Sequence, residues 1–122
     1  MAEMYEHEIR QGAVYWLALD YYECHHDKLR PWMVVSNEGC NRRSGDINVV
    51  PLSTSIKRMD LPCNVEVGRI IDPDHESIAK CSMLRTVRRE QLTAKNWAGQ
   101  AGVETIEKVI DGIKAQTAVW RH

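Results

Sequence analysis

The sequence PWMVVSNEG at residues 31–39 is a short apolar run that begins at a proline and stops at turn-forming residues. Its length and its β-branched and aromatic side chains are typical of a strand. Similar runs occur at residues 13–19 and 47–52. We expect two further strands, at residues 65–67 and in the longer stretch 78–87. Charged residues interrupt the second of these. Short strands at this close spacing predict a small barrel or a sandwich.

The C-terminal fifth of the chain has a helical period instead. Its apolar stripe consists of Val103, Ile106, Val109, Ile110 and Ile113. We expect this amphipathic helix to cover an open end or edge of the barrel, because exposed strand edges need protection. A docking face for a partner is the alternative interpretation. Residues 88–97 are expected to form a short helix that ends near Gly99, so the prediction is a mainly β fold of the α+β class.

Length and composition restrict the class of protein further. A chain of 122 residues suits one domain, residues 1–122, and 43% hydrophobic with 27% charged residues is ordinary globular composition. The acidic N-terminus does not resemble a signal peptide, and no run of apolar residues is long enough to cross a membrane. We therefore expect a cytoplasmic protein with no membrane association.

The cysteines show no metal-binding spacing. They are Cys24, Cys40, Cys63 and Cys81, with no CxxC pair. This spread predicts reduced thiols rather than a disulfide framework or a zinc knuckle. His25 and His26 follow Cys24, but adjacent side chains in an extended chain point apart. We expect neither a metal site nor a cofactor.

Charge is balanced overall but unevenly distributed. The formal net charge is -1, so no global basic excess indicates nucleic-acid binding. Residues 28–58 and 80–95 nevertheless contain clusters of Lys and Arg with few acidic residues. If the two stretches meet in space, they form a groove suited to a phosphate backbone. An ordinary solvated surface is the alternative interpretation.

Several short motifs occur in a characteristic order. They are LD at residues 19–20, KLRPWMVVSN at 28–37, VVPLST at 49–54, LP at 61–62 and LRTV at 84–87. Over residues 9–118 this ordered set resembles the MazF/PemK/Kid family of toxin endoribonucleases from bacterial toxin–antitoxin pairs. The resemblance implies an SH3-like barrel with a C-terminal helix, usually a homodimer, that cleaves single-stranded RNA without a metal. It also implies a cognate antitoxin partner, and contact with operator DNA only through the antitoxin complex.

The resemblance further implies which residues act on the scissile phosphate. In the family, the Arg of the RP motif and a hydroxyl of the VVPLT-type motif lie there. These positions correspond to Arg30 and to Ser53, with Thr54 as the alternative hydroxyl. A guanidinium suits the role, because the transition state of phosphodiester cleavage carries extra negative charge on its non-bridging oxygens. An ion pair of Arg30 with a loop carboxylate is the structural alternative.

A proton acceptor is less evident from the motifs. Counted forward from Asp20, His25 corresponds to a histidine that some family members have after the first strand, whereas counted back from Arg30 the position falls at Cys24. A neutral imidazole suits a general base, so His25 or His26 is the candidate, and two solvated loop histidines are the alternative. Later in the chain, Lys80 and Ser82 replace an Arg and an Asp of the family, and Met83 stands where Gln is usual. The alternative function is therefore a catalytically weakened relative that binds nucleic acid or antitoxin in operon repression. The residues expected to contact RNA are Lys28, Arg42, Arg43, Lys57, Lys80, Ser82 and Arg85.

Overall fold

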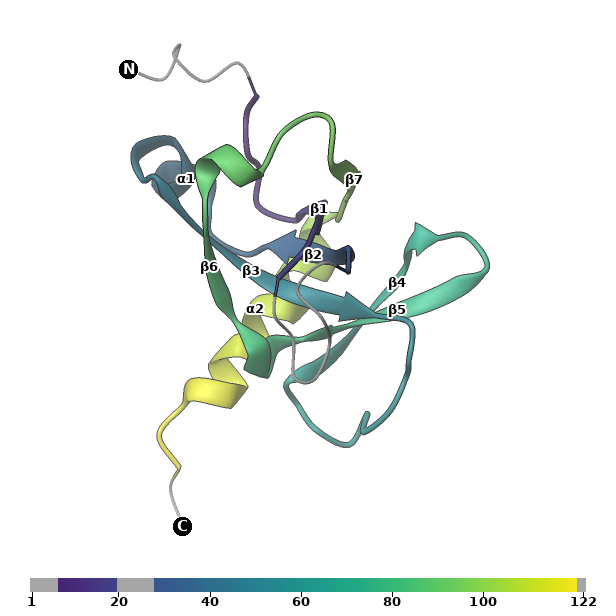
Figure 1. Cartoon of the computed structure of the whole chain (residues 1–122). Coiled ribbons are helices and arrows are strands. Elements are labelled where there is room, and N and C mark those ends of the chain that lie inside the picture. Colours follow the sequence, from purple (N-terminus) through teal and green to yellow (C-terminus); the bar gives the residue numbers. More distant parts are fainter. Residues whose placement is uncertain (1–6, 20–27, 121–122) are drawn as a thin grey trace.

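The computed structural model describes residues 7–19 and 28–120 of the chain. Its strands are β1 (Ala13–Leu17), β2 (Arg30–Val34), β3 (Asp46–Ser53), β4 (Asn64–Asp72), β5 (His75–Lys80), β6 (Arg85–Arg88) and β7 (Trp97–Gln100). Its helices are α1 (Glu38–Arg43) and α2 (Val103–Thr117), with single 3-10 turns η2 (Cys81–Met83) and η3 (Arg89–Gln91). The strands pair antiparallel in the order β4-β5-β3-β2-β1-β7, and β6 also pairs with β3 (Figure 1). This mainly β half-barrel with a C-terminal helix confirms the predicted fold class.

Strand β2 is buried on both faces, which explains its unbroken apolar sequence. Trp32 and Val34 pack into one core cluster with Tyr15, whereas Met33 and Val35 pack into a second cluster. Alternate residues of a strand point to opposite faces, so a strand between two cores needs apolar residues at every position. The sheet therefore divides the interior into two apolar layers.

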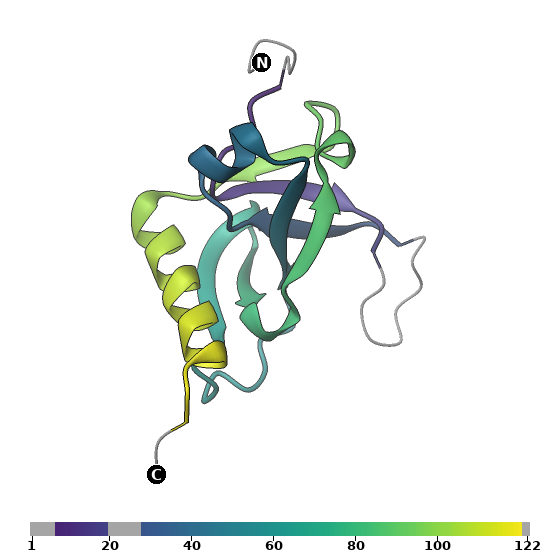
Figure 2. The same ribbon diagram turned by 90° about the vertical axis from the view of Figure 1, so that its left-hand side faces the viewer.

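Helix α2 covers the second of these layers, as predicted. Val109 is fully buried, and Ile106, Ile110 and Ile113 pack partly buried against the second cluster. Figure 2 shows the helix lying along one side of the strands. Val103, the first residue of the predicted stripe, remains 70% exposed. The apolar stripe thus serves the interior, except at its first turn.

Gly112 allows the close approach of α2 to the sheet. A Cβ atom at this position would lie 2.6 Å from Cγ2 of Val65 and 2.9 Å from Sγ of Cys81. We expect Gly112→Ala to lower the free energy of unfolding by about 1–3 kcal/mol, as is typical when a well-packed core is overfilled. Urea denaturation measures the change. Gly45→Ala is the control, because no atom lies within 4 Å of its added Cβ, and an unchanged midpoint for Gly112→Ala would contradict the close packing.

Two local predictions need correction. Within the described residues the sheet has seven strands rather than five, because η2 divides the stretch 78–87 into β5 and β6, and β7 was not expected. The short helix predicted at residues 88–97 is wrong: only η3 is helical there. The following turn is held by Asn96, whose side-chain amide donates to the carbonyls of Trp16 and Gln91 at 3.0 and 2.9 Å. This tie to β1 positions Trp97 to begin β7.

Helix α1 forms where the sequence indicated only a turn. Asn37 caps it, since its side-chain oxygen accepts a hydrogen bond from the backbone N–H of Cys40 at 3.0 Å. Asn41 is fully buried and donates to the carbonyls of Ile9 and Ser36 at 3.2 and 2.8 Å. These polar contacts inside the fold are not visible in a hydropathy pattern.

The described cysteines carry free thiols. Cys40 is exposed, whereas Cys63 and Cys81 are buried. Burial raises the pKa of Cys81 to about 12, so its thiol remains protonated at neutral pH. Cys24 lies outside the described residues. No helix in the described part of the chain is long and apolar enough to span a bilayer.

Candidate active site

A pocket of about 580 Å³ lies where the ends of β1, β2 and β3 meet the β4–β5 hairpin. Four residues of the predicted site line it, namely Lys28, Arg30, Ser53 and Thr54. They come from two segments more than twenty residues apart in the sequence. The fold therefore brings the RP and VVPLS motifs to one cavity.

The register of the sheet explains this meeting. Strands β2 and β3 run antiparallel with Trp32 opposite Pro51. Continuing that register by two residues places Arg30, the first residue of β2, opposite Ser53, the last residue of β3. Directly opposite residues of an antiparallel pair lie about 5 Å apart at their Cα atoms. A guanidinium and a hydroxyl are thus presented together at one end of the sheet.

The hydroxyl of Ser53 is held by its own turn. The backbone N–H of Ser55 donates to Oγ of Ser53 at 3.1 Å. A hydroxyl has one proton to donate and accepts through its lone pairs. With this lone pair engaged, the Ser53 proton is available to a ligand oxygen. This geometry favours Ser53 over the more exposed Thr54 as the positioned donor.

The pocket also contains a carboxylate, Asp72, which the sequence interpretation did not single out. Its Oδ1 accepts from the backbone N–H of Asp74 at 2.9 Å, and its Oδ2 lies 2.8 Å from Nδ1 of His75. The hydrogen bond from Asp74, followed by that from His75, lowers the pKa of Asp72. Asp72 is therefore ionised at neutral pH, opposite in charge to Lys28 and Arg30.

Trp16 also lines the pocket, and the sequence did not predict it as a site residue. It is the one exposed residue of β1, with 37% of its surface accessible. Its cross-strand partner is Pro31, the residue that follows Arg30. All five residues of β1 are apolar or aromatic, so the sequence does not show that Trp16 alone among them is exposed. That becomes visible only when the strand is placed in the sheet. The turn-forming residues at 72–75 likewise carry no sequence pattern that distinguishes Asp72 as a site residue.

The other predicted RNA contacts do not line this pocket. They are Arg42, Arg43, Lys57, Lys80, Ser82 and Arg85. Arg42, on α1, forms an ion pair with Glu8, in which Nη2 lies 2.9 Å from Oε1. This guanidinium holds the pKa of Glu8 below its usual range. The basic stretch at residues 80–95 contributes no residue to the pocket lining.

The predicted base, His25, lies outside the described residues, as does His26. In the segments 7–19 and 28–120, no three His, Cys, Asp or Glu side chains lie close enough together to hold a metal ion. The polar side chains that line the pocket are two cations, several hydroxyl groups and one carboxylate.

Comparisons with known proteins identify the family of the chain. The family described as PemK-like, MazF-like toxin of type II toxin-antitoxin system matches residues 10–117. No curated protein matches the chain.

Solved structures share the fold at low sequence identity. An endoribonuclease from a mycobacterial species in complex with its cognate antitoxin is 24% identical, with a TM-score of 0.71 over 93% of this chain and 99% of that chain. Another mycobacterial endoribonuclease is 23% identical, with a TM-score of 0.69 over 94% and 97% of the two chains. MazF from Deinococcus radiodurans is 15% identical, with a TM-score of 0.71 over 93% and 100%. Since the family match covers most of its length, this chain belongs to the PemK-like, MazF-like toxins of type II toxin–antitoxin systems.

Proposed function

We propose that the chain is an endoribonuclease toxin that cleaves single-stranded RNA, including mRNA in the cytoplasm, at a short sequence and without a metal ion. The observation that carries the proposal is the pocket that Arg30 and Ser53 both line, at the end of the sheet where the register of β2 and β3, continued by two residues, sets them opposite each other. Membership of the toxin family and the similarity to structures described as endoribonucleases support it.

The pocket suits attack by the ribose 2′-hydroxyl. The 2′-oxygen loses its proton and forms a bond to the adjacent phosphorus, while the bond from phosphorus to the 5′-oxygen breaks and that oxygen gains a proton. Negative charge grows on the non-bridging oxygens during this step. Arg30 offers two parallel N–H donors to these oxygens, and the Ser53 hydroxyl offers a third. The products are a 2′,3′-cyclic phosphate and a free 5′-hydroxyl.

His25 is proposed as the group that accepts the 2′-hydroxyl proton, with His26 as its neighbour in sequence. A histidine with a pKa near neutrality is suited to this transfer. Neither Lys80 nor Ser82 lines the pocket, so their departure from the family pattern removes no group from its described lining. This arrangement favours an active enzyme over a catalytically weakened binding module.

The proposed assembly is a homodimer that binds a cognate antitoxin and reaches operator DNA through that complex. A relative of the same fold was solved with its cognate antitoxin, which supports such a partner. In the proposed two-fold dimer the RNA groove draws basic residues from both subunits, and the two Arg88–Arg89 pairs are placed symmetrically. Sedimentation equilibrium at micromolar concentration checks the dimer, and a mass of 14 kDa would contradict it.

Primer extension on RNA treated with the purified protein in EDTA tests the proposed function. We expect stops that recur at one short sequence in unpaired regions, because the pocket offers its own cation and hydroxyl donors to the phosphate. Cleavage only after magnesium or zinc is added would contradict the metal-independent mechanism.

A further inference from the structure

The pocket has an apolar wall that phosphate chemistry leaves unused. Besides Lys28, Arg30 and the hydroxyl groups, its lining includes Trp16, Leu29, Pro31, Ile71 and Pro73. A phosphate gains nothing from contact with such surface. A nucleobase gains from it, because it has flat apolar faces and polar edges. The two kinds of lining therefore fit a nucleotide better than a phosphate alone.

Trp16 supplies the flat surface on this wall. It is the exposed position in a strand whose other residues are buried, and its partner across β1 and β2 is Pro31. The indole is therefore anchored next to the residue that follows Arg30. Stacking of an unpaired base on an aromatic side chain is a common mode of single-strand recognition.

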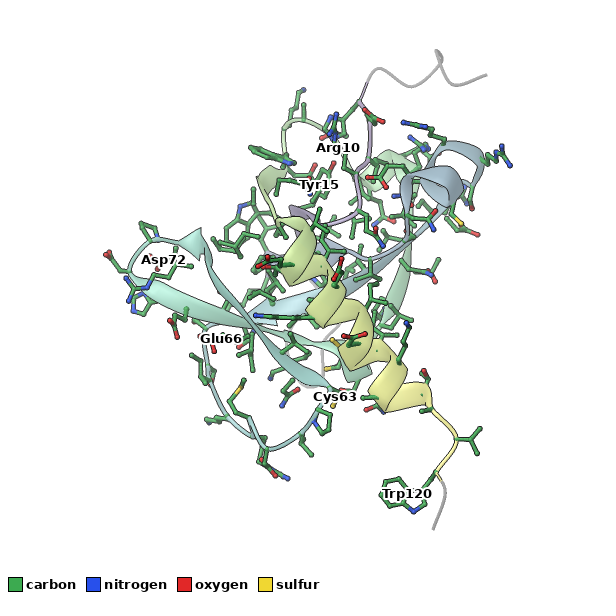
Figure 3. The ribbon with its side chains drawn as sticks, turned by 180° about the vertical axis from the view of Figure 1, so that it is seen from behind. Arg10, Tyr15, Cys63, Glu66, Asp72 and Trp120 are labelled. Atoms are coloured by element: carbon green, nitrogen blue, oxygen red, sulfur yellow. The ribbon has the colours of Figure 1, made fainter. Side chains whose placement is uncertain are left out.

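Asp72 supplies a polar edge. Figure 3 shows it at the end of the β4–β5 hairpin, and its two oxygens are held by Asp74 and His75. An ionised carboxylate repels a phosphate but accepts hydrogen bonds from N–H groups, and each oxygen retains a second lone pair. Its presence in the same pocket as Arg30 indicates that a donor-bearing group lies beside the phosphate.

We propose that the pocket holds one unpaired nucleobase of the RNA, stacked on Trp16 with its N–H donor edge toward Asp72, next to the phosphate bound by Arg30. This inference rests on the proposed function. Guanine is the expected base, because its N1–H and N2–H groups are adjacent donors that match the two oxygens of a carboxylate. The pocket volume of about 580 Å³ is within the usual range for a small-ligand site.

Binding of uncleavable probes tests the stacking without any need for catalysis. The probes are fluorescein-labelled oligothymidylates with one central deoxyguanosine, which lack the 2′-hydroxyl. Trp16→Ala is expected to weaken their binding about tenfold, the usual scale for loss of one stacked base, and Trp16→Phe is expected to retain most of it. Trp97→Ala is the matched control, since Trp97 is also exposed, at 48%, but does not line the pocket.

Replacement of the central deoxyguanosine by deoxyinosine, which lacks the N2 amino group, tests the edge contact. Wild type is expected to prefer the guanine probe several-fold, and Asp72→Asn to lose that preference. Asp74→Asn, in the same turn but outside the pocket lining, should keep it. A preference that survives in Asp72→Asn, or wild-type affinity in Trp16→Ala, overturns the base pocket.

A second readout covers the case in which Trp16→Ala does not fold. Binding of the guanine probe should quench tryptophan fluorescence in wild type but not in folded Trp16→Phe, and equal quenching in both overturns the inference. If wild type cleaves RNA and folded Trp16→Ala binds the probes as tightly as wild type, this inference alone is rejected. Absence of RNA cleavage by a wild type that binds the probes through Trp16 rejects the proposed catalysis and retains the base pocket.

Discussion

Replacement of Arg30 by Ala is expected to lower the rate of RNA cleavage by at least about 100-fold, the usual loss when one positioned donor to a developing oxyanion is removed. The effect should fall on kcat, because the extra charge on the phosphate exists only in the transition state. Single-turnover cleavage of a labelled oligonucleotide measures it. Induced expression of Arg30→Ala should likewise no longer arrest growth.

Two variants make this result specific. Arg30→Lys keeps the charge but loses the planar pair of donors, so its rate should fall between those of wild type and Arg30→Ala. Lys28→Ala removes the other cation of the pocket and should raise KM more than it lowers kcat. Thermal melts establish that each variant is folded. An Arg30→Ala protein that is folded and as toxic as wild type would show that the active site lies elsewhere.

Removal of the Ser53 hydroxyl is expected to have the next largest effect, about 100-fold or more on kcat when serine is replaced by alanine. The N–H of Ser55 donates to this oxygen at 3.1 Å, which engages one lone pair and leaves the hydroxyl proton available for donation. Ser53→Thr should retain activity because it keeps the hydroxyl. The same single-turnover assay measures the cleavage rates of wild type, Ser53→Ala and Ser53→Thr.

Thr54→Ala serves as the matched control, since Thr54 lines the same pocket one residue further along the chain. It should lose less than about tenfold. A large loss in Thr54→Ala with little change in Ser53→Ala would reverse the assignment of the two hydroxyl groups, which the sequence alone left open.

The parts of the fold that could be predicted are those with a clear hydrophobic pattern, either an unbroken apolar run or a helical stripe. The apolar run at residues 31–35 and the stripe of α2 each follow from burial, on two faces for the strand and on one face for the helix. The helix expected at residues 88–97 failed for a different reason. Side-chain hydrogen bonds from Asn96 to distant backbone carbonyls determine that segment, and such contacts leave no periodic signal.

The site was only partly predictable for a related reason. Arg30 and Ser53 could be found because they belong to motifs that resemble a known family. Their proximity, however, depends on the register between β2 and β3. Trp16 and Asp72 belong to no such motif, since one lies in an apolar run and the other in a turn. The tertiary fold brings Trp16 of β1 and Asp72 of β4 into the lining of one pocket, although the two strands are not neighbours in the sheet.

The most direct test of the central claim uses two oligonucleotides that differ at one atom. Both carry a cleavage site mapped by primer extension, and one has a 2′-deoxynucleotide on the 5′ side of the scissile phosphate. In EDTA, the all-RNA strand should be cut by the wild-type protein to a 2′,3′-cyclic phosphate and a 5′-hydroxyl, while the deoxy strand should remain intact. Cleavage of the deoxy strand, or products with a 5′-phosphate, would contradict attack by the 2′-hydroxyl in the Arg30–Ser53 pocket.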